Sequence, residues 1–281
     1  MYVTDIGAQL WRFDISNGQP ASNLVAGGVI AQLGAAPSAT PTAANSRRFY
    51  YAADSAIVLG EGQAFINIAV GSGHRAHPNS TLTEDAFFAV RDYQPFVPRT
   101  QTAYDTLVTP VTVSDLIDIT DDVSTAVPNG AAGWKLWLRA AGSFAGEKSL
   151  SEARTFNNKI FFTTFQPGAS ASATGCVPSL GTNRLYIVDV VTGAPVNNLD
   201  GVGDPESLTT SDRYTEFAGS ISSEVVFLFP TGDGTDDDGD GDDEECEGDE
   251  CDPIFCVGLQ CFPPGFLNNP VRTFWSQEES Y

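Results

Sequence analysis

Two eleven-residue segments of this 281-residue chain follow one pattern. The first, Leu10–Pro20, reads LWRFDISNGQP, and the second, Leu185–Pro195, reads LYIVDVVTGAP. In each copy an alternating apolar run ends at Asp, a Gly-containing turn follows, and a Pro that cannot donate to a ladder closes the unit. Each copy is therefore predicted to be one strand of a recurring hairpin.

A third, looser copy runs from Phe88 to Tyr93 (FAVRDY) and closes at Pro95. It keeps the apolar alternation and the Asp but lacks the Gly turn. Strand-turn units that recur, and that cannot each bury an apolar face alone, indicate a radial array such as a propeller. We therefore predict an all-β fold, a partial β-propeller of antiparallel four-stranded blades.

The composition agrees with this fold class. The chain has 18 Phe, 27 Gly and 17 Pro but one Met, which favours strands and turns over long surface helices. Hairpin turns are expected at 60–62 and 157–158. One blade is expected to comprise the strands 47–53, 56–59, 63–70 and 86–92. Other strands are predicted at 1–5, 133–140, 159–165, 184–190 and 224–229.

One segment interrupts the strand pattern. Residues 112–123 show little alternation, and Ser114 is a candidate N-cap, so a short helix or turn is expected there as an insertion between blades.

Three regions are expected along the chain: partial propeller blades at 1–230, an acidic low-complexity insertion at 231–252, and a Cys-containing segment at 253–281 that returns to the propeller. At roughly 40–50 residues per blade, the chain has material for about three to five blades, fewer than a closed ring usually needs. Because Met1 already lies inside a predicted strand, we expect a fragment of a longer secreted protein. A cytoplasmic protein that begins abruptly is the alternative.

The net charge of −22 is unevenly distributed. Gly232–Asp252 holds nine Asp and four Glu with no Lys or Arg, so the rest of the chain is only mildly acidic. This pattern disfavours nucleic acid and anionic membranes as partners and favours cations or basic protein surfaces. No signal peptide opens the chain, and no apolar run approaches the ~20 residues that span a bilayer.

Four of the five cysteines are regularly spaced. Cys246, Cys251, Cys256 and Cys261 lie five residues apart, and Cys176 stands alone. This clustering indicates an oxidising compartment and one or two disulfides that pin the C-terminal segment. A zinc cluster is the alternative, but zinc sites usually use C-x2-C pairs, whereas these gaps are C-x4-C. The spacing leaves the connectivity open.

Seven strings occur in one order between Met1 and about Trp275: YVTDIGAQLWRFD, RRFYYAAD, IAVGSGHRAHP, GWKLWL with GEKSLSEARTFNNKIFFTTF, CVPSLGTNRLYIVD, EVVFLFP, and CVGLQCFPPGFLNNPVRTFW. Together they resemble the C-terminal β-propeller domain of the PilY/PilC family, the type IV pilus biogenesis and tip-associated adhesin proteins. The resemblance implies a modified propeller, export to the periplasm and cell surface, and no catalysis. It also implies a role in pilus assembly and in opposing retraction, with pilins, minor pilins or a host surface as partners.

Two departures limit what the resemblance transfers. Family members carry a large N-terminal adhesive region and the first propeller blades ahead of the YV-x-D…LWRFD strand, and this sequence has neither. The Asp-rich calcium loop of the better-studied members precedes the same strand. None of its ligands is therefore assigned to a numbered residue here.

The acidic tract carries a calcium-type pattern of its own, D-x-D-x-D-G followed by five residues and Glu. Alternate carboxylates in a tight turn converge on one hard cation, Gly permits the bend, and the distal Glu closes the shell. The predicted Ca²⁺ ligands are Asp236, Asp238, Asp240, Asp242 and Glu247. The alternative is a solvated, disordered insertion, because an Asp replaces the usual apolar anchor and no helices flank the loop.

Other candidate residues are assigned structural roles. His74 and His77, the only histidines, lie in a Gly-flanked loop without a third ligand nearby in sequence. Asp14, Asp92 and Asp189 occupy equivalent points of the three repeats and are interpreted as turn-capping residues, not catalytic carboxylates. The Trp residues are interpreted as blade packing.

The sequence thus predicts a non-catalytic, secreted scaffold that binds pilus components. A quinoprotein-like propeller enzyme is the rival class, since LYIVDVVTGAP also resembles the strand-turn unit of quinone-cofactor propellers. Those repeats recur about every forty residues and continue to a docking Trp that is missing here. A stand-alone extracellular binding module is a third hypothesis.

Overall fold

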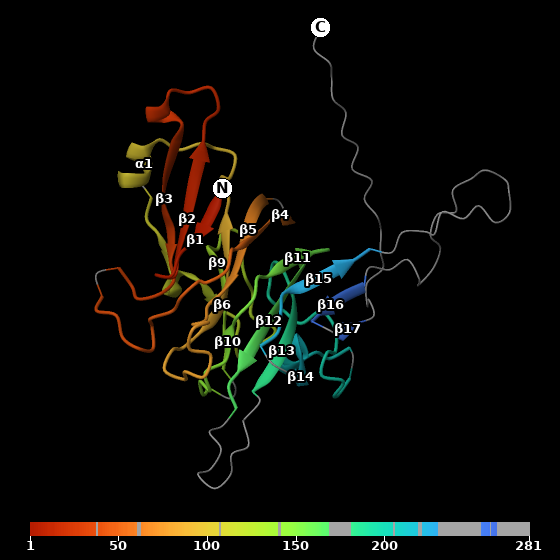
Figure 1. Ribbon diagram of the computed structural model, residues 1–281. Helices are drawn as coiled ribbons and strands as arrows, with labels where there is room; N and C mark the ends of the chain where they lie inside the picture. Colours follow the sequence, from red (N-terminus) through yellow and green to blue (C-terminus); the bar gives the residue numbers. More distant parts are fainter. Residues whose placement is uncertain are drawn as a thin grey trace, which may run out of the picture. The chain divides into compact units, whose positions relative to one another are not determined.

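The computed structural model describes residues 1–37, 39–60, 63–106, 108–139, 142–168, 181–204, 206–218, 221–229, 254–258 and 260–262. The chain divides into two units, Met1–Val225 and Val226–Tyr281, and each is described by itself. The described part of the first unit contains three β-sheets, called blades 1, 2 and 3 below (Figure 1).

Blade 1 has the strand order β1-β2-β3-β7. Its strands are β1 (Tyr2–Thr4), β2 (Gln9–Ile15), β3 (Val25–Gln32) and β7 (Val111–Thr112). β1 and β2 form the predicted N-terminal hairpin, and β3 pairs antiparallel with β2 after the 3-10 turn η1 (Ala21–Asn23). The short strand β7 adds in parallel to β3, and the helix α1 (Gln101–Thr106) packs against β3.

The strand β3 is not predicted from sequence, because its segment VAGGVIAQ has two central glycines, which lower strand propensity. The structure explains the glycines by close approach. A Cβ at Gly27 would lie 2.3 Å from the ring of Phe13, and a Cβ at Gly28 would lie 2.9 Å from the ring of Tyr104. At both positions the lack of a side chain leaves room for an aromatic ring to pack against the strand.

Blade 2 has the order β4-β5-β6-β9-β8. Its strands are β4 (Asp54–Gly60), β5 (Gln63–Gly71), β6 (Ala86–Asp92), β8 (Ile117–Asp118) and β9 (Gly133–Trp137). Pairing of Gly60 with Gln63 confirms the predicted β4–β5 hairpin. All the pairs are antiparallel except β8 with β9.

The prediction of a strand at 47–53 is wrong. After β4, β5 and β6, the next strand of blade 2 is β9, which pairs with β6. The amide of Phe49 donates to the carbonyl of Asp5, and the carbonyl of Arg48 accepts from the amide of Gly73, so the backbone bonds go to two different loops instead of one ladder. Arg47 and Phe49 are buried in this crossing segment, and their burial produces the strand-like alternation.

Blade 3 has the order β10-β12-β13-β14, and β11 also pairs with β12. Its strands are β10 (Lys148–Ser149), β11 (Arg154–Phe156), β12 (Lys159–Gln166), β13 (Thr182–Asp189) and β14 (Tyr214–Ala218), all antiparallel. Asn157 and Asn158 have φ angles of 46° and 58°, the left-handed region that a two-residue I′ turn requires. This confirms the predicted turn between β11 and β12.

The three copies of the repeat form a central strand of each blade: β2, β6 and β13. Blade 2 lies between two apolar cores, because the two faces of β6 point in opposite directions. Phe87 belongs to the core shared with blade 3, where its ring stacks on Phe162 with centroids 3.7 Å apart. Phe88 belongs to the core shared with blade 1, together with Leu10 and Ile30. The prediction of a partial propeller is confirmed.

The segment 112–123 contains the 3-10 turn η2 (Val113–Asp115), which confirms the short helix or turn expected there. Its N-cap is Thr112 and not Ser114. Thr112 and Asp115 form a reciprocal capping box, with the Thr112 amide 2.7 Å from the Asp115 carboxylate. The segment carries the chain from blade 1 to blade 2 through the parallel strands β7 and β8.

The C-terminal sheet has the order β15-β16-β17. Its strands are β15 (Val225–Leu228), which begins at the unit boundary, β16 (Ile254–Val257) and β17 (Gln260–Phe262). Cys256 and Cys261 face each other in the β16–β17 hairpin and form a disulfide. The other candidates, Cys176, Cys246 and Cys251, lie outside the described residues. The predicted limits of the acidic insertion also fall there and stay predictions.

Candidate functional site

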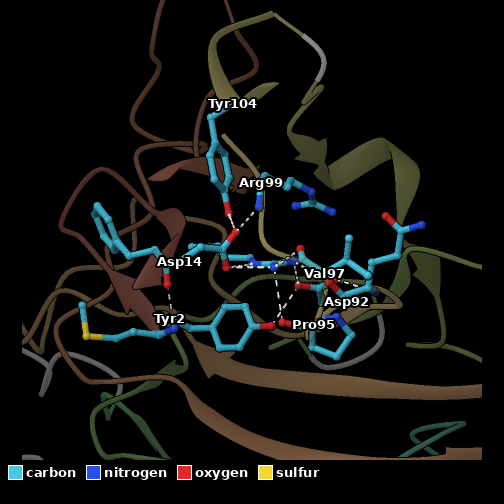
Figure 2. A network of polar contacts seen from close by, with 11 residues as sticks. Tyr2, Asp14, Asp92, Pro95, Val97, Arg99 and Tyr104 are labelled. Carbon is cyan, nitrogen blue, oxygen red and sulfur yellow. Dashed lines mark hydrogen bonds and ion pairs between the residues drawn. The ribbon is translucent and has the colours of Figure 1, made fainter. Parts of the chain in front are cut away.

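Blades 1 and 2 are joined by a buried arginine of β2, Arg12, which binds two carboxylates, Asp14 and Asp92. Figure 2 labels both carboxylates within this network of polar contacts. Arg12 shares one face of β2 with Leu10 and Asp14, because side chains alternate along a strand. It is only 1% exposed. Its Nε donates to Asp14 at 2.9 Å, and its Nη1 donates to Asp92 of β6 at 2.8 Å. One guanidinium therefore links the Asp residues of the first and third repeat copies.

The same guanidinium also holds the segment 94–99, called the strap below. Nη1 of Arg12 donates to the carbonyl of Gln94 at 2.9 Å. Nη2 donates to the carbonyls of Pro95 at 3.2 Å and Val97 at 2.9 Å. A guanidinium has five N–H donors, and these contacts occupy all of them. Arg12 thus fastens the strap to both blades.

The two carboxylates bind the strap's amides as well. Asp14 Oδ2 accepts from the Arg99 amide at 2.8 Å and from the Tyr104 hydroxyl at 3.0 Å. Burial alone would raise the pKa of Asp14, but hydrogen bonds from the Arg99 amide, Arg12 and Tyr104 outweigh burial and hold the pKa below its ordinary value. Asp14 therefore stays ionised beside Arg12.

The Asp92 carboxylate is satisfied in the same way. Its Oδ2 accepts from the Tyr2 hydroxyl at 2.8 Å, and its Oδ1 accepts from the Gln94 amide at 2.9 Å. Burial, followed by the hydrogen bond to Asp92, raises the pKa of Tyr2, which keeps the hydroxyl as a donor. The network is thus complete within the chain, and it positions the strap instead of presenting a reactive group.

The three repeat Asp residues have different roles. Asp189 caps its turn as predicted, since Oδ1 accepts from the amides of Val191 and Thr192. Asp92 also caps, through the Gln94 amide. The turn-cap interpretation is wrong for Asp14, whose described bonds go to Arg12, Arg99 and Tyr104. Instead of capping its own turn, the Asp14 carboxylate accepts hydrogen bonds from Arg12 and from the amide of Arg99 in the strap.

Blades 2 and 3 are joined by a second buried arginine. Arg213, at the end of η3 (Thr210–Arg213), is 2% exposed. Its donors reach the carbonyls of Gly193 at 3.1 Å, Thr120 at 2.9 Å and Ile119 at 2.7 Å. Each junction between consecutive blades therefore contains an arginine that fastens loops.

Sequence reasoning missed both arginines. A usable signal exists for Arg12, because it occupies a position between Leu10 and Asp14 where strand alternation places a buried side chain. A buried charge requires partners, so such a position predicts a polar network. Nothing local predicts the role of Arg213.

The predicted metal ligands Asp236, Asp238, Asp240, Asp242 and Glu247 lie outside the described residues. Within the described part of the chain, no group of three or more His, Cys, Asp or Glu is placed to hold a metal ion. The rings of His74 and His77 lie 4.5 Å apart, and Tyr50 stacks on His74 at 5.8 Å. The fully buried Trp134 packs in the core between blades 2 and 3, as interpreted from the sequence.

A buried carboxyl group lies away from the Arg12 network. Asp85 is 1% exposed, and its Oδ1 accepts from the Ser72 hydroxyl at 2.7 Å. None of the described groups donates to its Oδ2. Burial raises the pKa of Asp85 to about 6, against the opposing effects of the Ser72 hydrogen bond and of Lys148 and Arg47.

This pKa predicts a pH-dependent effect of Asp85→Asn. Between the ordinary pKa of 3.8 and about 6, the folded chain keeps the Asp85 proton while the unfolded chain loses it, so this group lowers stability as the pH rises. Relative to wild type, the variant should therefore gain about 2–3 kcal/mol of unfolding free energy between pH 4 and pH 7. Urea unfolding at both pH values measures the difference.

Asp121→Asn is the matched control, because that side chain is 71% exposed and paired only at the surface. Only the part of the pH dependence of Asp85→Asn that exceeds that of this control is assigned to the burial of Asp85. A pH dependence for Asp85→Asn that is no greater than that of the control would contradict a raised pKa.

The geometry defines a class of protein: a partial β-propeller whose blades are fastened by buried arginine networks. No protein-family model matches the chain, and a search of curated proteins finds no similar sequence. The crystal structure of the Pseudomonas aeruginosa PilY1 C-terminal domain has a similar fold, with a TM-score of 0.56 and 14% identity over 92% of this chain. This likeness agrees with the resemblance seen in the sequence and confirms the expected fold.

The chain spans 56% of the length of that domain. In the described part of the chain, no helix is long and apolar enough to cross a bilayer.

Proposed function

We propose that this chain is a non-catalytic scaffold of type IV pilus assembly that binds pilins or minor pilins. The observation that carries the proposal is the likeness of 92% of the chain to the PilY1 C-terminal domain. The Arg12 network supports a binding role, because its hydrogen bonds hold a surface segment, the strap, in one position. Binding loops are commonly presented in this way on rigid scaffolds.

We further propose that the protein acts in the periplasm and at the cell surface. The disulfide between Cys256 and Cys261 supports this location, since disulfides persist in oxidising compartments.

Deletion of the gene in the source organism tests the role in pili. We expect less pilin in the fraction sheared from the cell surface, and restoration by the wild-type gene on a plasmid. If the protein opposes retraction, removing the retraction motor as well should also restore surface pilin. Unchanged surface pilin in the single deletion would count against the proposal.

Biolayer interferometry with purified pilin and minor-pilin ectodomains then identifies the direct partner.

Two further measurements test the remaining parts of the proposal. Turnover of a primary alcohol with an artificial electron acceptor, after loading with a quinone, would overturn the non-catalytic assignment. We also propose that the acidic tract binds Ca²⁺, because it carries the D-x-D-x-D-G pattern. Isothermal titration of the wild type and of Asp238→Ala/Asp240→Ala tests this. We expect heat of binding only for the wild type, and negligible heat for both proteins would remove calcium from the proposal.

A further inference from the structure

A cavity of about 490 Å³ lies beside the strap, where blade 1 and blade 2 meet. Ile30 of β3 and Val90 of β6 line it and are almost completely buried. Ala103 of α1, Val108 and Val111 complete the apolar lining. A cavity of this size and character accommodates a small apolar group with a few polar contacts.

The charged residues that line the cavity differ in whether their side chains already have hydrogen-bond partners. Asp92 uses both carboxylate oxygens within the Arg12 network. Arg91 directs its guanidinium to the carbonyls of Pro128 and Val191. The side chains of Asp92 and Arg91 therefore already bind other groups of this chain.

Arg99 is the exception among the charged residues lining the cavity. Its backbone amide donates to Asp14, whereas its guanidinium lies over the ring of Tyr104, 5.8 Å from the centroid. The residue as a whole is half-buried. No carboxylate of the described residues lies within ion-pair distance of this guanidinium. Among the described residues, the Arg99 guanidinium therefore has neither a carboxylate partner nor a hydrogen-bond acceptor at the cavity.

The strap presents apolar side chains on the same segment. Phe96 is 77% exposed and Val97 is 56% exposed, although the strap's carbonyls and amides are bound by Arg12, Asp14 and Asp92. Proline at 95 and 98 restricts the backbone further. A rigid segment loses little entropy on binding, and exposed aromatic residues beside arginine are typical of interaction hot spots.

We propose that the strap and the adjoining cavity bind a protein segment that carries an apolar side chain next to a carboxylate. The apolar side chain enters the cavity against Ile30 and Val90, and the carboxylate accepts hydrogen bonds from the Arg99 guanidinium. Phe96 and Val97 contact the flanking residues of the segment. Charge complementarity selects this occupant, because a guanidinium binds a carboxylate through paired, charge-assisted hydrogen bonds. The proposal rests on this geometry and not on the assignment to pili.

Small probes test the chemistry directly on the full chain. N-acetyl-L-leucine carries both recognised groups, N-acetyl-L-leucinamide lacks the carboxylate, and N-acetylglycine lacks the apolar side chain. In two-dimensional NMR titrations at one ionic strength, we expect saturable shifts with N-acetyl-L-leucine that centre on the strap and on 103–111. The two other probes should bind at least about tenfold more weakly, since each loses one of the two contacts.

Two variants separate recognition from folding. Arg99→Gln keeps the backbone amide that binds Asp14, and it should reduce binding of N-acetyl-L-leucine to the level of the amide probe. Ala103→Leu fills the cavity and should weaken the same probe while Arg99 is intact. Arg139→Gln removes another arginine, one paired with Asp121 at the surface, and should leave binding unchanged.

Equal affinity of N-acetyl-L-leucine for wild type and Arg99→Gln would overturn the proposal. Saturable shifts confined to other parts of the chain, or no saturable shifts with any probe, would overturn it as well. Loss of binding in the Arg139→Gln variant would show a general charge effect and would count equally against it. Each of these outcomes is independent of the surface-pilin measurement, so this site and the role in pili fail or survive separately.

Discussion

Replacing Arg12 with methionine should lower the unfolding free energy by about 3–5 kcal/mol, the usual cost of removing one partner from a buried ion pair. Methionine keeps much of the side-chain volume but leaves Asp14 and Asp92 without their shared cation, and three strap carbonyls without a donor. Urea unfolding, followed by tryptophan fluorescence, measures the loss.

Arg139→Met is the matched control for this prediction. Arg139 is 23% exposed, but its partner Asp121 is 71% exposed, so water screens the pair and its loss should cost about 1 kcal/mol. Hydrogen exchange should also show faster exchange of the strap amides in the Arg12 variant. Equal destabilisation by the two substitutions would mean that the network does not join blades 1 and 2.

Gly133→Ala should be the most damaging of the small substitutions. Gly133 begins β9 with a φ of +133°, and a Cβ there would lie 1.9 Å from the carbonyl oxygen of Ala89. Ala89 lies on β6, whose residues are all buried, so the obstructing backbone has little room to move. Overpacking and backbone strain together should lower the unfolding free energy on the order of 3 kcal/mol or more.

Gly130→Ala supplies the control, because Gly130 also has a positive φ of +83° but no atom within 4 Å of the added Cβ. It should cost only the backbone strain, on the order of 1–2 kcal/mol. Denaturant titrations of the two variants side by side give the comparison. If Gly133→Ala were no more harmful than Gly130→Ala, the tight β6–β9 approach would be refuted.

Most central strands were predictable because their evidence is local. Alternation at Leu10–Asp14 and Leu185–Asp189, and the Asn157-Asn158 turn, are patterns within a few residues, and the structure confirms them. The errors occur where distant contacts override local preference. β3 is a strand despite Gly27 and Gly28, because two aromatic rings occupy the space that side chains would fill.

The site was predictable only in part. The repeat identified Asp92 and Asp189 as turn caps, and the structure bears this out. It could not identify the role of Asp14, because the donors to that carboxylate include the Arg99 amide and the Tyr104 hydroxyl, 85 and 90 positions away. No sequence window spans such a contact. Arg99 was not predicted for the same reason.

By itself, the sequence determined an all-β chain whose recurring strand-turn unit forms the centre of each blade. It could do so because strand alternation and turn chemistry act between neighbouring residues. Only the tertiary structure decided which strands become neighbours, that buried arginines fasten the blades, and that Arg99 lies beside an apolar cavity with no carboxylate partner among the described residues. Those features depend on burial and on partners supplied by remote segments, and a charged side chain reveals its role only when its surroundings are known.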